Sequence, residues 1–163
     1  MISWEEAVEL VGTTSKYGHA LLVVDMMESL AGRLREDEQE WRLVGLLHDL
    51  DYDEVRGNMS KHGVVAAERL KGKLPKHCLY AIKAHDYRTG FKPKNKLDKA
   101  LIAADTVAIV VKRSGKKVEQ FDVATFREEI ERTCVSQPWL RDNVSLCDDL
   151  GLGVNEILRL CLC

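Results

Sequence analysis

Apolar residues recur at helical spacing along almost the whole chain, and capping residues or glycines stand at the breaks. Ser3 with Glu6, Asp37 with Glu40, and Thr125 with Glu128 have the spacing of capping boxes. The segment over 87–96 contains glycine and proline without periodicity, so we expect a loop there. The pattern predicts helices over about 3–12, 17–30, 37–50, 60–71, 75–85, 97–113 and 155–160. It also predicts a helix that begins at Thr125 and a further segment that Pro138 opens and that runs to Gly151.

The chain shows no strand-like alternation, no internal repeat and no low-complexity stretch. Its 163 residues, 45% apolar and 31% charged, suit one domain with a hydrophobic core. We therefore expect an all-α protein, a single compact multi-helix bundle over residues 1–163. The tryptophans Trp4, Trp41 and Trp139 are expected to fill the core.

No uncharged apolar run approaches the roughly 18 residues of a membrane helix, and the start MISWEEAVEL lacks the basic region of a secretory signal. Five cysteines without a CxxC motif are expected to be reduced thiols, with Cys134 and Cys147 as small buried hydrophobes. Cys161 and Cys163 form a CxC, but a zinc site would need further ligands. We expect a cytoplasmic protein that does not bind membranes.

The net charge of −2 conceals a strong asymmetry along the chain. Residues 56–117 hold 16 of the 24 Lys and Arg but only four acids, a local charge of +12, while the flanks together carry −14. This distribution favours a small anionic ligand or a local nucleic-acid contact, and a solvated basic face is the plain alternative.

Charged residues interrupt two of the most apolar predicted helices. His48 and Asp49 follow the run WRLVGLL, and Asp105 lies in the middle of KALIAADTVAIVV. An ionised carboxylate in such a setting would cost several kcal/mol without a partner. Asp105 must therefore meet a cation, a metal or a dense set of hydrogen-bond donors.

Histidines supply the matching ligand type. His19, His62 and His85 stand beside small or apolar neighbours on predicted helices, and glycines adjoin two of them. Imidazoles with carboxylates are the usual ligands of Fe, Mn, Zn or Ni. A single histidine of this kind is more often an ordinary core residue, so the argument depends on the whole set.

The ordered series His19, His48-Asp49, His62, His85 and Asp105 resembles the HD superfamily of metal-dependent phosphohydrolases, in the branch with extra histidines between the HD pair and the last Asp. The resemblance covers about residues 15–115, and residues from about 120 to 163 look like a helical extension.

The resemblance implies that His19, His48, Asp49 and Asp105 bind one divalent metal, and that His62 and His85 bind a second one bridged by Asp49. Fe and Mn are the first choices, with Zn, Co, Ni or Mg as alternatives. A single metal, with His62 and His85 on the substrate phosphate, stays open.

The residues after the HD pair depart from the family pattern. Leu50, Asp51, Tyr52 and Asp53 replace the glycine and lysine of many binuclear members, and Tyr52 stands where nucleotidase-type members have a catalytic Glu. Asp53, one helical turn beyond Asp49, is the best substitute for proton transfer, and water is the other possible source of the proton. The alternative is that Asp51 and Asp53 are solvated acids at a helix end.

The expected activity is hydrolysis of a phosphoester in a small anionic compound, with a nucleotide favoured by family analogy and hydroxide bound to the metal as the attacking group. Asp49 and Asp53 are the catalytic candidates. Lys61, Arg88 and Lys112 are the candidates for binding the phosphate. The lysines at 92, 94, 96 and 99 are expected to be exposed, with a mobile lid as the alternative.

Two other functions stay open. One is an HD-type diiron oxygenase, and the other is a non-catalytic module that binds a nucleotide. A nucleic-acid partner is not expected, because aromatic residues are sparse and no RNA-binding motif is present. The apolar C-terminal helix either covers the core or forms a homodimer interface.

Overall fold

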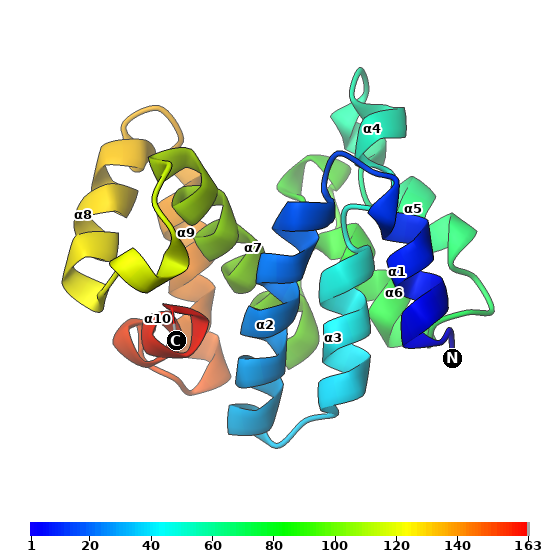
Figure 1. The fold of residues 1–163 in the computed structure, drawn as a ribbon, viewed down its shortest axis with the longest axis horizontal. Coiled ribbons are helices and arrows are strands. Elements are labelled where there is room, and N and C mark those ends of the chain that lie inside the picture. The colour runs from blue at the N-terminus through cyan, green and yellow to red at the C-terminus, as the bar shows by residue number, and fades with distance from the viewer. Residues whose placement is uncertain (163) are drawn as a thin grey trace.

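The computed structural model describes residues 1–162, except for the side chain of Cys147. Within this range the regular elements are helices, and the all-α prediction is confirmed (Figure 1). Cys134 is buried as expected, whereas the thiols of Cys147 and Cys163 lie outside the described residues. The α-helices are α1 (Trp4–Gly12), α2 (Tyr17–Leu34), α3 (Glu38–Leu47), α4 (Tyr52–Val55), α5 (Val64–Arg69), α6 (Lys76–Ala84), α7 (Lys96–Ser114), α8 (Val123–Cys134), α9 (Trp139–Ser145) and α10 (Val154–Leu162), with short 3-10 turns η1 (Met59–Lys61), η2 (Tyr87–Thr89), η3 (Val118–Gln120) and η4 (Leu146–Leu150).

The long helix α7 is the central element of the fold. It packs against α2, α3 and α6 on one side and against α8, α9 and α10 on the other. In Figure 1 it accordingly lies between α1–α6 at the right and α8–α10 at the left. Helices α2 and α3 form the most extensive helix pair, and small and branched apolar side chains of α7 are buried along most of its length.

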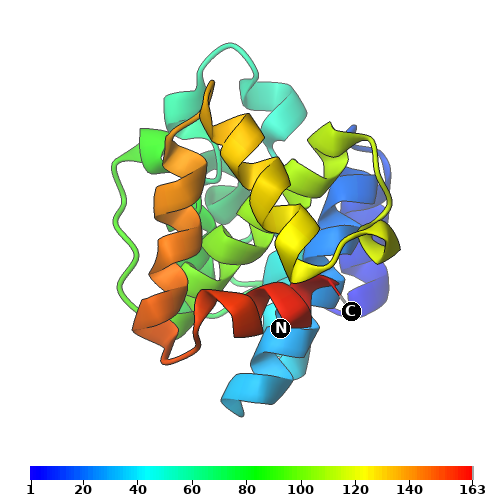
Figure 2. The same cartoon turned by 90° about the vertical axis from the view of Figure 1, so that its left-hand side faces the viewer.

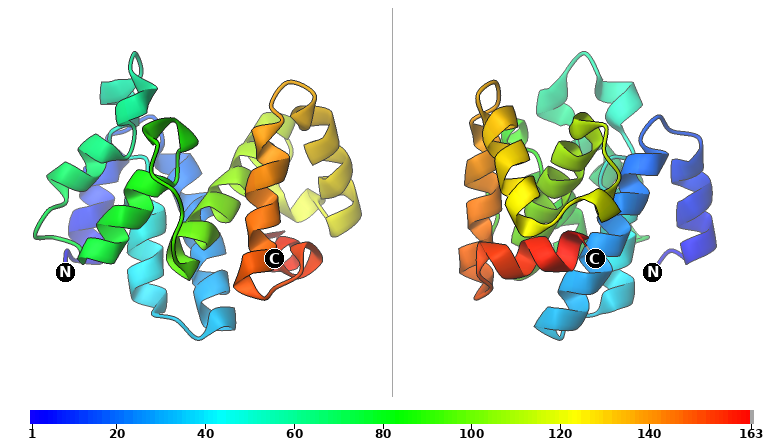
Figure 3. Two further views of the ribbon diagram at one scale, coloured as in Figure 1. Left: turned by 180° about the vertical axis from the view of Figure 1, so that it is seen from behind. Right: turned by 60° about the vertical axis from the view of Figure 1, so that its left-hand side comes forward.

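The C-terminal helices form a layer over one end of this bundle. Figure 2, turned to face that end, shows α8, α9 and α10 in front of α7, and both views of Figure 3 agree with this placement. Ile157, Leu158 and Cys161 of α10 are buried, and α10 packs against α2 and α7. Helix α10 therefore covers the core, and the homodimer stays a prediction.

Some helix boundaries differ from the sequence prediction for local reasons. The segment predicted as one helix over 60–71 is the turn η1 followed by α5, because Gly63 between them has a φ of +75°. Helix α8 begins earlier than predicted, since Asp122 and not Thr125 is its N-cap. Asp37 caps α3, but the side chain of Glu40 bonds His77 instead of closing the capping box.

None of the helices in residues 1–162 has the length and apolar character needed to cross a membrane.

Candidate metal centre

Six side chains from separate parts of the chain meet at one end of the bundle. They are His19 from α2, His48 and Asp49 at the end of α3, His62 after η1, His85 at the end of α6, and Asp105 from the middle of α7. The four histidines and Asp49 are each at most 5% exposed, and the side chain of Asp105 is 15% exposed. Chain folding thus brings the entire predicted ligand set together.

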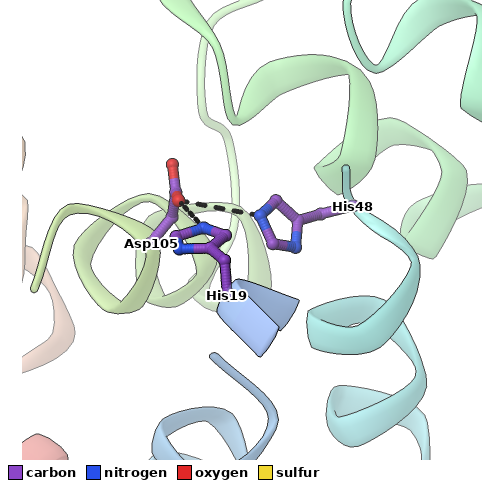
Figure 4. Close-up of side chains that lie close together, drawn as sticks. All are labelled: His19, His48 and Asp105. Atoms are coloured by element: carbon purple, nitrogen blue, oxygen red, sulfur yellow. Dashed lines mark hydrogen bonds and ion pairs between the residues drawn. The ribbon is translucent and has the colours of Figure 1, made fainter. Parts of the chain in front are cut away.

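Four ligand atoms face one another around the first half of this centre. The Nε2 atom of His19 lies 2.8 Å from Oδ1 of Asp105, and Nε2 of His48 lies 3.6 Å from the same oxygen (Figure 4). Oδ2 of Asp49 is 3.7 Å from the His19 nitrogen and 3.5 Å from the His48 nitrogen. Ligands bound to an ion at about 2.1 Å at right angles are about 3 Å apart, so these spacings suit a shared metal.

The second half of the centre uses the other oxygen of Asp49. Its Oδ1 lies 2.8 Å from Nε2 of His62 and 3.6 Å from Nε2 of His85. The two imidazole nitrogens are 3.2 Å apart. Asp49 therefore directs one oxygen toward each group of histidines, so it would be a ligand shared by both groups if two ions bind.

Hydrogen bonds from the opposite ring nitrogen orient three of these imidazoles. Nδ1–H of His48 donates to the carbonyl of Gly45 (2.7 Å), and Nδ1–H of His85 donates to the carbonyl of Ile82 (2.6 Å). Nδ1–H of His62 donates to Oδ1 of Asp51 (2.8 Å). Such bonds fix the tautomer that leaves the Nε2 lone pair for a metal.

The buried Nε2 of His48 shows whether these residues fit a metal ion. Its side chain is fully buried, and this nitrogen has no hydrogen-bond partner among the described residues. A buried polar atom left unsatisfied costs about 1–3 kcal/mol. A cation shared with His19, Asp49 and Asp105 would satisfy it, so the residues present fit a divalent metal.

Asp51 supports the centre from behind and is not a solvated acid. It is fully buried and accepts hydrogen bonds from the backbone N–H groups of Gly63 (3.1 Å) and Ala66 (2.8 Å) in addition to His62. The solvated alternative is wrong for Asp51, because the chain reverses after α3 and turns this carboxylate toward the start of α5. No periodicity in the sequence signals that reversal.

The charges of the cluster shift its proton affinities in opposite directions. Burial alone would raise the pKa of Asp49 and Asp105, but the neighbouring histidines hold both well below the usual range. Burial lowers the pKa of His62, yet hydrogen bonds to Asp49 and Asp51 outweigh it and raise that pKa to about 9. A metal binding here must displace a proton from His62.

A cavity of about 630 Å³ opens beside the six ligands. His19, Asp49, His62, His85 and Asp105 contribute to its wall. Basic side chains from five positions also line it: Lys16, Arg56, Arg88, Lys112 and Arg113. The positive charge of the middle of the chain is thus partly concentrated next to the cluster, where it favours an anionic ligand.

Of the residues predicted to bind phosphate or to transfer a proton, two line the cavity and two lie outside it. Arg88 and Lys112 line the cavity, and Arg88 is held by a forked contact with Asp86. Lys61 does not line it. Asp53 lies outside the cavity as well, where its carboxylate accepts hydrogen bonds from the backbone N–H (2.7 Å) and the hydroxyl of Ser15. The predicted proton transfer from Asp53 gains no support from this geometry.

The lysine-rich loop lies away from the centre. Lys96 pairs with Glu36 (2.9 Å) and Lys99 pairs with Asp149 (2.8 Å), and neither they nor the lysines at 92 and 94 line the cavity. The lysines at 92, 94 and 96 are exposed as expected, whereas Lys99 is only partly exposed, and none of these contacts supports a lid.

Lys16 is a residue that the sequence analysis missed. Its ammonium nitrogen lies 2.9 Å from Oδ2 of Asp49 and 3.7 Å above the ring centre of Tyr52. The available signal was its position three residues before His19, which places both side chains on one face at the start of α2.

Trp139 packs against the core, as predicted, but it also faces the cavity. It is half-buried and lines the cavity together with Gln137 and Asn143. Trp41 is buried as predicted, and Trp4 is partly buried against the core.

A family model described as "HD domain" matches residues 17–110, which is more than half of the chain and includes all six clustered ligands. The chain therefore belongs to the HD domain family. HD domains bind divalent metals and are in general metal-dependent hydrolases, so membership indicates phosphohydrolase-type activity. No curated protein and no solved structure matches this chain.

Proposed function

We propose that this protein is a metal-dependent phosphohydrolase that cleaves a phosphoester of a small phosphorylated compound, in the first instance a nucleotide. The main observation behind the proposal is that four histidine Nε2 atoms and two carboxylates converge beside a cavity lined by basic residues, with all of these side chains except the fully buried His48 contributing to the cavity wall. Metal ligands next to cationic side chains are what hydrolysis of an anionic ester requires.

The residues divide into two ligand groups that share Asp49. His19, His48, Asp49 and Asp105 would hold one ion, and Asp49, His62 and His85 would hold the other. Iron and manganese suit this mixed nitrogen and oxygen set. When bound, such ions supply a water that is deprotonated near neutral pH and neutralise charge on the phosphoryl oxygens.

The side chains of this chain bind and orient the phosphate. Lys112 is exposed at the cavity wall without an ion pair among the described residues, so its charge is available to substrate. Arg88 is fixed by Asp86 and presents the remainder of its guanidinium group. Lys16 beside Asp49 adds a third positive charge next to the metal ligands.

Protonation of the leaving group is assigned to solvent. Asp53 is engaged by Ser15 outside the cavity, and Asp51 is buried behind His62 with its oxygens occupied. The described residues that line the cavity include no carboxylate besides the ligands and Asp86, which is bound to Arg88. Water that enters through the cavity mouth is therefore the source of this proton.

The basic lining suits an anionic substrate, and measurement of the reaction separates the hydrolase from the oxygenase alternative. The experiment is phosphate release from a panel of phosphomonoesters and phosphodiesters under anaerobic conditions with Mn²⁺ restored. Turnover supports the hydrolase. Uptake of O₂ by the iron-loaded protein without phosphate release would favour the oxygenase, and tight nucleotide binding without any turnover would favour the binding module.

Matched lysine variants sharpen this test. Lys112→Ala removes a cavity charge and is expected to raise KM for phosphorylated substrates roughly tenfold. Lys92→Ala removes a lysine that does not line the cavity and serves as the control. Equal KM values for the two variants would remove Lys112 from the site.

A further inference from the structure

The segment beyond the family match completes the cavity. Residues 17–110 match the HD domain, yet Gln137, Trp139 and Asn143 lie after this range and line the same cavity as the metal ligands. Neither the metal centre nor the basic residues account for these three side chains. Gln137 lies in the connection between α8 and α9, and Trp139 and Asn143 belong to α9.

A hydrogen bond anchors this segment next to the metal centre. Nδ2 of Asn143 donates to Oγ1 of Thr106 (3.1 Å), and Thr106 directly follows the ligand Asp105 on α7. Helix α9 packs against α7 along this contact. Trp139 stands four residues before Asn143, so it lies on the same face of α9 one turn away.

The wall formed here is aromatic and carries an unsatisfied polar atom. The rings of Trp139 and Tyr87 are in contact, with centroids 6.0 Å apart and planes inclined by 38°. Tyr87 is 60% exposed, although large aromatic side chains normally bury more of their surface. Oε1 of Gln137 is buried and has no hydrogen-bond partner among the described residues.

Resting on the proposed hydrolysis at the metal centre, we propose that Trp139 and Gln137 determine specificity for the leaving group. A flat heteroaromatic ring stacks on the wall of Trp139 and Tyr87, and the side chain of Gln137, which lines the same cavity, turns so that its unpaired Oε1 accepts from an N–H at the ring edge. The phosphate of the same molecule lies at the metal ligands beside Lys112. A phosphoester without a ring gains neither contact.

Stacking of a base on an aromatic side chain contributes enough to be measured, with effects on binding of roughly tenfold for each base. The substitution Trp139→Leu is therefore expected to lower the ratio of kcat/KM for nucleoside 5′-monophosphates to kcat/KM for ribose 5-phosphate roughly tenfold. The loss should appear in KM. Gln137→Met keeps the length of the side chain without the acceptor, and it should lower the same ratio for rings that carry an edge N–H.

Binding measured without turnover separates this proposal from the proposed function. Adenosine, cytidine and guanosine should quench tryptophan fluorescence of the metal-loaded protein, and the quench should disappear in Trp139→Phe. Trp4→Phe is the matched control, because Trp4 packs against Arg42 outside the cavity, and it should retain the quench.

Failure of the specificity proposal and failure of the proposed function give different results. A nucleoside quench without hydrolysis of any phosphoester overturns the proposed function and leaves the ring wall supported. Hydrolysis with an unaltered substrate ratio in both Trp139→Leu and Gln137→Met overturns the specificity proposal. A quench that survives in Trp139→Phe overturns it as well, and the melting temperature of each variant shows whether a loss reflects unfolding.

Discussion

Replacing Gly63 by alanine is expected to destabilise the protein by about 3 kcal/mol and to disturb the ligand His85. Gly63 has a φ of +75°, and this left-handed conformation costs an alanine about 1–2 kcal/mol. A Cβ here would stand 2.2 Å from the carbonyl oxygen of Ile82 and 3.1 Å from the His85 ring. Backbone forced apart in a packed site adds about 1–3 kcal/mol, and the lower entropy of the unfolded alanine chain offsets less than 1 kcal/mol.

Gly72→Ala is the matched control for backbone strain. Its φ of +76° is nearly the same, but no atom lies within 4 Å of the position of its Cβ. We expect a loss of about 1 kcal/mol there, so the two variants should differ by about 2 kcal/mol. For a chain of this size the difference corresponds to roughly 4–8 °C in melting temperature.

The assay is thermal unfolding of the metal-free variants, followed by titration with Mn²⁺. The Ile82 carbonyl that would meet the new Cβ also accepts the Nδ1–H bond of His85, so Gly63→Ala should bind metal more weakly than Gly72→Ala. Equal melting temperatures and equal metal affinities for the two variants would refute the close packing of Gly63 against this carbonyl.

Three other buried side chains, those of Asp51, His62 and Cys78, lead to further predictions. Asp51→Ala removes the acceptor of three buried hydrogen bonds and should cost about 3 kcal/mol in urea unfolding, and a loss under 1 kcal/mol would contradict its buried position. The pKa of His62 is raised from 6.5 to about 9 in the metal-free protein. Protonated His62 therefore stabilises the folded state fully below about pH 6.5, and this stabilisation is lost as pH rises through 9. A melting temperature in EDTA that does not fall between pH 7 and 9 would contradict this pKa. Burial, and to a smaller extent the charge of Glu40, raises the pKa of the Cys78 thiol. This thiol should therefore resist alkylation in the native protein at pH 8. Rapid alkylation of Cys78, detected by mass spectrometry, would contradict the prediction.

Much of the fold was predictable because its helices obey local rules. Glycines and capping residues end or begin helices near the predicted places, as Gly115 does for α7 and Pro75 for α6. The errors arise where a tertiary contact decides the local structure. Gly63 has a left-handed conformation and its backbone N–H donates to the carboxylate of Asp51, and Glu40 bonds His77 of another helix instead of the backbone N–H at the start of its own helix.

The candidate metal-binding residues were predictable for a different reason. Asp105 is the one charged residue in the mostly apolar run ALIAADTVAIVV, and that contrast is visible in the sequence. The ligand-supporting role of Asp51 and the cavity positions of Lys16 and Trp139 were not visible. Each of them depends on how separate helices meet, and neither composition nor periodicity records that.

Metal analysis of the protein purified without added metal tests the central claim most directly. We predict about two equivalents of a transition metal in each wild-type chain. The variant Asp105→Ala should lose the ion held with His19 and His48, and His62→Ala should lose the ion held with His85. A wild-type chain that neither contains transition metal nor takes up Fe²⁺ or Mn²⁺ on dialysis would contradict the account.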